Sequence, residues 1–120
     1  MSVLWDHFRF HGPALALNER ILEAFRAHCP HQMLPLELPG LIAKSGFVGT
    51  MQEPVMIFER SMNEYSYGYW VARFVAAFVV GEGISGDDAE LWLQQLRAAD
   101  KDGRFGFVSV PVLTVTSVSN

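Results

Sequence analysis

The longest apolar stretch of the chain covers residues 69–80 and is interrupted only by Arg73. It is well short of the roughly 20 residues that span a bilayer. A helix over 66–80 carries apolar side chains on two adjacent stripes and has almost no polar face; these stripes contain Trp70, Phe74, Ala77 and Phe78, with Tyr67, Val71 and Val75 beside them. The sequence therefore predicts a helix that is buried or lies at an interface.

Composition limits what the rest of the chain can be. A length of 120 residues fits one domain, residues 1–120. Half of the residues are hydrophobic and 18% are charged, which excludes a disordered chain. One cysteine excludes an internal disulfide framework. A formal net charge of −4, with basic residues scattered singly, gives no footprint for nucleic acid. The first ten residues lack a secretory pattern, so we expect a cytoplasmic protein without a membrane span.

Two helices are expected in the first half of the chain. Pro13 suits the first turn of a helix, which should end near Cys29 because Pro30 disfavours helical geometry before it. Pro35 and Pro39 frame a second helix over 36–45, capped by Gly46. The inward residues predicted for the two helices are Leu17, Ile21, Leu22 and Phe25 in the first, and Leu38, Leu41 and Ile42 in the second.

Two strands are expected in the second half. Residues 47–59 contain the apolar run 55–58, which predicts a strand covered on both faces. Residues 104–118 alternate or run apolar and predict a long final strand. Between the strands, Ser85 and Asp88 form a capping-box-like start for a helix after the 66–80 helix; its inward stripe is Trp92, Leu93, Leu96 and Ala99. The fold class is α+β, with about four helices packed on a two-stranded antiparallel sheet.

Several of these segments resemble the C-terminal half of a class I S-adenosylmethionine-dependent methyltransferase of the small-molecule, ubiquinone-biosynthesis-like type. Residues 4–12, with Trp5-Asp6 and His11-Gly12, resemble the segment after the family's fifth strand. Residues 19–25 resemble the helix that follows it, and 38–47 resemble the sequence leading into the sixth strand. Residues 88–96 and 104–107 resemble the inserted helix and the seventh strand. The resemblance covers nearly the whole chain.

The resemblance implies methyl transfer from S-adenosylmethionine to a small acceptor. It places Trp5, Asp6 and His11 near the mouth between cofactor and acceptor, where His11 could act as general base. It also makes the inserted region a cover for the acceptor, with the substrate-binding candidates Tyr65, Tyr67, Tyr69 and Trp70. The alternative for His11 is a backbone hydrogen bond at the Gly12-Pro13 turn, and the alternative for the tyrosines is a core anchor.

The Gly-rich turn that binds the cofactor in this family has no counterpart here. Gly81 and Gly83 are expected between two helices, and Gly103 and Gly106 precede a strand, so neither pair has the strand–turn–helix context that the motif needs. The isolated chain is therefore expected to bind no S-adenosylmethionine and to be inactive alone, as a truncated half of that fold. We expect a partner, either a separate cofactor-binding half or a second copy of the chain. The rival hypothesis is a non-catalytic or repurposed module that binds small molecules or dimerises.

Metal binding is not expected. His7 and His11 are four residues apart, but Gly12-Pro13 favours extended backbone before it rather than the helix that such a pair needs. His28 lies near a helix C-terminus, where its charge interacts favourably with the helix dipole without a metal. Cys29, between His28 and His31, is treated as an ordinary cysteine.

Overall fold

The computed structural model describes residues 2–28 and 34–118. Six strands and four α-helices follow one another in pairs in these ranges, in the order β1, β2, α1, α2, β3, β4, α3, α4, β5, β6. Their bounds are β1 Ser2–Val3, β2 Arg9–His11, α1 Leu15–Phe25, α2 Leu34–Lys44, β3 Phe47–Pro54, β4 Ile57–Glu59, α3 Tyr67–Val80, α4 Gly86–Lys101, β5 Gly106–Ser109 and β6 Pro111–Val118. The α+β class with four helices on antiparallel strands is confirmed.

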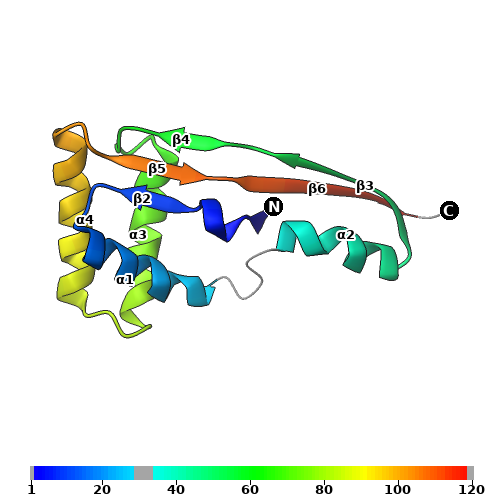
Figure 1. The fold of residues 1–120 in the computed structure, drawn as a ribbon, viewed down its shortest axis with the longest axis horizontal. Coiled ribbons are helices and arrows are strands. Elements are labelled where there is room, and N and C mark those ends of the chain that lie inside the picture. The colour runs from blue at the N-terminus through cyan, green and yellow to red at the C-terminus, as the bar shows by residue number, and fades with distance from the viewer. Residues whose placement is uncertain (1, 29–33, 119–120) are drawn as a thin grey trace.

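The two predicted strands are paired antiparallel, but each is interrupted. Residues 47–59 form β3 and β4, and residues 104–118 form β5 and β6. The N-terminal segment adds a third strand to each sheet, β1 to one and β2 to the other. The strand orders are therefore β1-β6-β3 and β2-β5-β4, with β6 and β5 in the middle. Figure 1 shows the two sheets following one another along the molecule.

The molecule has two parts of different character. The body contains β2, β4, β5, α1, α3 and α4, and the arm contains β1, α2, β3 and β6 (Figure 1). The extents are 54 × 29 × 21 Å and the radius of gyration is 16.8 Å, compared with about 13.6 Å for a compact domain of this length. The arm causes this elongation, since it projects beyond the three packed helices.

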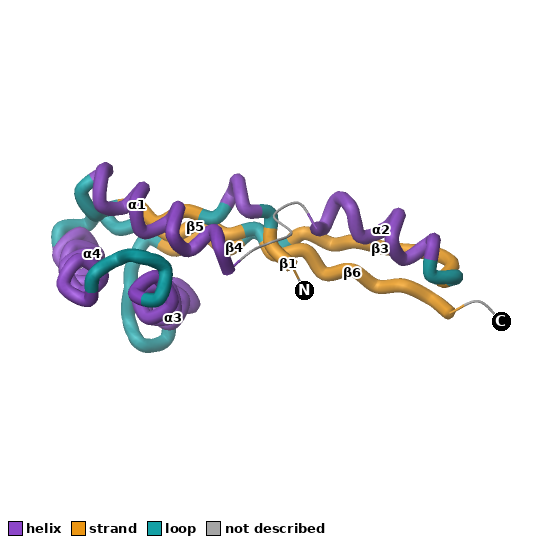
Figure 2. The backbone as a smooth tube through the Cα atoms, turned by 90° about the horizontal axis from the view of Figure 1, so that it is seen from below, coloured by secondary structure: helices purple, strands orange, loops and turns teal. Residues whose placement is uncertain are grey.

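The core lies in the body. Phe10, Ile21, Trp92, Leu96 and Phe107 are fully buried, where α1, α3 and α4 meet the β2-β5-β4 sheet. Figure 2 shows α3 and α4 on the same side of the strands, whereas α2 lies along β3 in the arm. The inward residues predicted for the first helix are all buried, as are three of the four predicted for the helix after Ser85, the fourth being half-buried.

Buried polar groups join the body elements. Asn18 is 3% exposed; its side-chain amide donates to the Phe10 carbonyl at 2.8 Å and accepts from Trp92 Nε1 at 2.9 Å. These two bonds connect β2, α1 and α4. Ser85 caps α4 as predicted, its hydroxyl accepting from the Asp88 N–H.

Two predictions about packing are wrong. Val55, Met56 and Phe58 are exposed, because helices cover only one face of β4, so 55–58 is not a strand covered on both sides. Leu41, predicted to face inward, is half exposed because α2 packs on a narrow arm; Pro39 lies inside α2, within the predicted range 36–45. Gly46, with φ of +89°, does end α2 as expected.

The 66–80 helix is present as α3, with the Ser66 hydroxyl as its N-cap. Its buried residues are Gly68, Ala72, Val75, Ala76 and Val79, whereas Trp70 and Phe74 point outward. No helix among the described residues combines the length and the hydropathy needed to cross a bilayer.

Candidate functional site

The outer side of α3 carries large aromatic residues. Tyr67, Trp70 and Phe74 are 53%, 56% and 49% exposed, and their spacing of three and four residues places them along one side of the helix. We call these three residues the aromatic face. An exposed aromatic strip on a buried helix is a feature that a ligand or partner can use.

Neighbouring groups hold the aromatic face in place. The Trp70 indole Nε1 donates to the Glu64 carbonyl at 2.8 Å. The Arg73 guanidinium lies 5.3 Å from the Trp70 ring centre and 5.7 Å from that of Tyr69, within cation–π range. The Tyr69 and Trp70 rings meet edge to face at 5.1 Å. Trp70 is thus exposed but fixed in orientation.

The start of α3 is fixed by a carboxylate from the sheet. Glu59, on β4, accepts from the backbone N–H groups of Tyr67 at 3.0 Å and Gly68 at 2.6 Å. A Cβ at position 68 would lie 2.8 Å from Glu59 Oε1 and 3.1 Å from the Phe107 ring, so the glycine makes this approach possible. Because Glu59 occupies the free N–H groups, this helix end is not open to an anionic ligand.

A second aromatic group connects α3 to α1. The Phe25 ring lies 5.9 Å from Phe74 and 5.6 Å from Phe78. The His28 imidazole is stacked on Phe25 at 5.3 Å and meets the edges of Phe74 and Phe78 at 5.1 Å. Sequence reasoning placed His28 only at a helix end. Its spacing of three from Phe25, together with the i, i+4 pair Phe74 and Phe78, was the available signal.

Trp5 belongs to this second group. It is half-buried and packs against Phe8 at 5.6 Å and Phe25 at 6.2 Å. Trp5 and the aromatic face therefore meet the same ring system from two sides, through Phe25 and Phe74. Of the seven predicted site residues, Trp5, Tyr67, Tyr69 and Trp70 are connected by ring contacts to the core or to each other, whereas Asp6 and Tyr65 are exposed.

His11 stands apart from the aromatic face. It is exposed at the end of β2 and pairs with Gly106. Alternation along the strand directs His11 away from the side where Phe10 is buried, whereas Tyr67 contacts Phe107 on the buried side, at 6.0 Å. The structure therefore does not bring His11 together with the tyrosines, and its role as a general base stays a prediction.

A small polar cluster surrounds the end of β2. The Arg9 guanidinium donates two hydrogen bonds to the Glu19 carboxylate. This interaction lowers the pKa of Glu19; the positive charges of Arg9 and His11 add to the effect, and desolvation opposes it. The cluster is exposed and connects β2 to α1.

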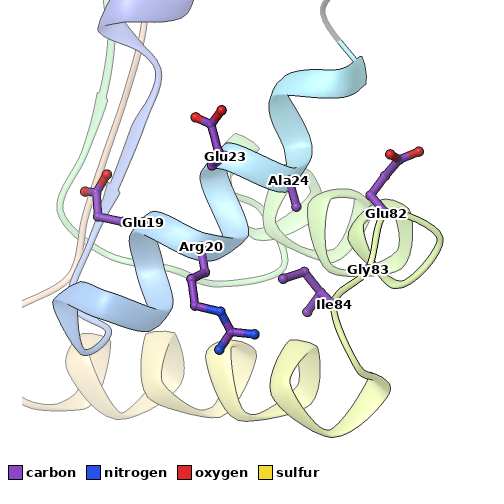
Figure 3. Close-up of a pocket in the computed structure, with 7 residues that line it drawn as sticks. All are labelled: Glu19, Arg20, Glu23, Ala24, Glu82, Gly83 and Ile84. Atoms are coloured by element: carbon purple, nitrogen blue, oxygen red, sulfur yellow. The ribbon is translucent and has the colours of Figure 1, made fainter.

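A shallow hollow of about 480 Å³ lies between α1 and the turn from α3 to α4. It is lined by Glu19, Arg20, Glu23, Ala24, Glu82, Gly83 and Ile84, and includes none of the predicted site residues. Figure 3 shows the three carboxylates standing apart from one another rather than converging on a common point. Arg20 is paired with Asp88 at 3.2 Å. This hollow lacks the enclosure and the convergent polar groups of a ligand pocket.

No three histidine, cysteine, aspartate or glutamate side chains in the described ranges gather as they would around a metal ion. Cys29 and His31 lie outside the described residues.

The glycines do not fit a nucleotide-type cofactor. Gly81 and Gly83 lie between α3 and α4, and Gly103 and Gly106 lie before and in β5, as expected. Gly12 does connect β2 to α1, but a Cβ there would be 2.5 Å from the Ala99 Cβ, so Gly12 makes room for α4. The Ala14 N–H at the start of α1 donates to Gln95 at 2.9 Å. The described residues thus do not fit S-adenosylmethionine.

No protein-family model matches the chain. No curated protein and no solved structure matches it either.

Proposed function

We propose that this chain is the C-terminal, acceptor-binding part of an S-adenosylmethionine-dependent small-molecule methyltransferase of the cytoplasm. The observation that supports it most is the arrangement of the sheet. The segments resembling those around the family's fifth and seventh strands contribute β2 and β5, which pair antiparallel in one sheet, whereas the segment that resembles the sequence leading into the sixth strand leads into β3 of the neighbouring sheet. Segments so far apart in the sequence become neighbours if they belong to one such fold.

The aromatic face is the acceptor side in this proposal. Tyr67, Trp70 and Phe74 offer flat apolar surface, and Arg73 adds a cation beside Trp70. Such a surface suits a planar acceptor that stacks on an indole and carries a polar substituent. His11 lies on the other face of the sheet from the aromatic face, and its role as a general base stays a prediction.

The cofactor must be held by a separate half, because the described residues do not fit it. S-adenosylmethionine supplies the methyl group when it is bound to that half. The present chain covers and orients the acceptor, and exclusion of water by Trp5, Phe25 and the aromatic face is its physical contribution.

Calorimetric titration with S-adenosylhomocysteine tests this proposal. The titration is run on the chain alone and on the chain mixed with a separately expressed cofactor-binding half of the same methyltransferase type. We expect no heat from the chain alone and saturable heat in the mixture. Methyl transfer by the mixture should fall at least tenfold in Trp70→Ala and remain unchanged in Leu36→Ala, which alters an exposed apolar residue of α2. Absence of transfer in every mixture contradicts the proposal.

The rival function, a small-molecule-binding module without a cofactor, is favoured by the exposure of Trp70 and Phe74 combined with the lack of a fitting cofactor turn. Fluorescence of 8-anilinonaphthalene-1-sulfonate added to the chain alone tests it. Saturable binding that Trp70→Ala removes and Leu36→Ala retains supports the module, whereas equal loss in both variants indicates nonspecific adsorption.

A further inference from the structure

The arm contains a strand edge that is mostly unpaired. Strand β6 has eight residues, and β3 pairs with residues 112–118 on one side. On the other side, β1 pairs only with Pro111 and Val112. In the described ranges, the stretch 113–118 therefore has a strand on one side only.

The backbone groups on this open edge can be assigned from the alternation of the ladder. The Pro111 carbonyl accepts from the Val55 N–H at 2.8 Å, on the β3 side, whereas the Val110 carbonyl accepts from the Leu4 N–H at 3.2 Å, on the β1 side. Successive residues of a strand point their N–H and C=O groups to alternate sides. Thr114 and Thr116 therefore direct their N–H and C=O groups to the open edge.

The edge lacks the features that usually prevent pairing. Residues 112–118 include no charged residue and no proline, and they are mostly Val and Thr, which favour strands. By contrast, the outer edge of β3 has a register shift at Gly49, whose φ is +69°, and ends at Pro54. The β6 edge is thus open to a strand and the β3 edge is not.

Side chains beside this edge also lack cover. Leu113 and Val115 are 46% and 47% exposed, and Met51, the cross-strand neighbour of Val115, is 67% exposed. The arm has little core of its own: among its described side chains, the buried ones are Pro35, Pro111 and Val112. Beyond Val112 the arm sheet consists of β3 and β6 alone, covered by one helix, and such a two-stranded ribbon gains stability from a further strand.

We propose that the β6 edge pairs with the same edge of a second copy of this chain, antiparallel and about a two-fold axis at Thr116. In this register Thr116 lies opposite Thr116 of the second copy, and Thr114 lies opposite residue 118. Every hydrogen-bonded pair joins two residues that point toward the open edge, so the register is self-complementary. It stops at residue 114 and leaves β1 paired with Pro111 and Val112. The uncharged strand brings no like charges together in spite of the net charge of −4.

The two-fold pairing continues the sheet across both arms. Leu113 and Val115 of each copy lie on the same face as Met51, so four strands share one apolar strip. This association does not depend on the methyltransferase proposal, since it uses only the backbone and side chains of the arm.

Cross-linking tests the register directly. Hydrogen-bonded antiparallel pairs have Cα atoms about 5.5 Å apart, which suits a disulfide. In a Cys29→Ser background, we expect Thr116→Cys to give a covalent dimer on mild oxidation. Thr50→Cys, on the outer edge of β3, is the matched control and should give no covalent dimer under the same conditions. Equal cross-linking at both positions, or none at Thr116→Cys, overturns the proposal.

Sedimentation equilibrium tests the association without a cross-link. We expect the wild-type chain to sediment as a dimer at micromolar concentration and Thr116→Pro to weaken dimerisation at least tenfold. Proline removes an N–H that β3 does not use, so the monomer should keep its fold; its circular dichroism spectrum checks this. If Thr116→Pro fails to fold, Thr116→Glu replaces it, because two carboxylates at the axis should weaken the dimer more at low salt than at high salt. A wild-type monomer at all concentrations, or species that keep growing beyond a dimer, contradicts the two-fold pairing.

Discussion

Asn18 is the polar side chain whose loss should cost the body most. Replacement by alanine leaves two buried groups without partners, the Trp92 indole N–H and the Phe10 carbonyl. Each unsatisfied buried group costs about 1–3 kcal/mol, so we expect Asn18→Ala to lower the free energy of unfolding by about 2–6 kcal/mol. A domain of this length has a total of about 6–18 kcal/mol. The loss is therefore a large share of the stability.

Urea denaturation followed by far-ultraviolet circular dichroism measures this loss. Asn63→Ala is the control, because that amide is exposed and should change the unfolding free energy by less than about 1 kcal/mol. Trp92→Phe removes the donor to Asn18, so the double variant should be less destabilised than the sum of the single variants by about 1–2 kcal/mol. A loss below about 1 kcal/mol for Asn18→Ala, or additive losses in the double variant, would refute the role assigned to this amide.

Three further variants probe the body and the arm. Glu59→Gln should lower the unfolding free energy by about 1 kcal/mol in urea titrations, because a neutral amide caps α3 less well, whereas Glu64→Gln should leave it unchanged. Gly12→Ala should cost about 2 kcal/mol or more, since the added methyl meets α4 and φ is +132°, but Gly40→Ala on open helix surface should gain about 0.5–1 kcal/mol. Because the pKa of Glu19 is lowered in the fold, its carboxylate stabilises the protein at neutral pH and loses that effect as pH falls through the lowered pKa. The melting temperature of Glu19→Gln should thus lie slightly below that of wild type at about pH 7 and equal it at about pH 2. Because the pair is exposed, the difference in unfolding free energy at about pH 7 should be less than about 1 kcal/mol.

Local signals predicted the helices well. The capping residue Ser85 and the 3.6-residue period of Leu17, Ile21 and Phe25 depend only on neighbours in the chain, and the structure places them as expected. The covering of the sheet could not be predicted in this way. The run 55–58 was interpreted as buried on both faces, but its exposure depends on where helices from other parts of the chain end.

The candidate site shows the same limit. The tyrosines and Trp70 were predicted as a group because they are close in sequence, and most of them do lie near the start of α3. The contact of Trp5 with Phe25 depends on where the N-terminal segment meets α1, and the contacts of His28 with Phe74 and Phe78 depend on the crossing of α1 with α3. The spacing within any one segment does not reveal these long-range contacts. His11 was associated with Trp5 by closeness in the chain, yet strand alternation sends it to the other side of the sheet.

The order of strands in the sheets has a consequence for how the chain folds during synthesis. The central strand β5 follows all four helices in the sequence, and Phe10 of β2 can pair with Phe107 only after the whole segment between them has been made. Closing so long a loop is entropically costly, and contacts of this kind slow folding. Until then α1, α3 and α4 have no sheet to pack on and expose apolar surface, the condition under which nascent chains aggregate. Loss of residues 104–120 would therefore remove the middle of the protein rather than its end, and we expect such a chain to be degraded rather than to remain partly folded.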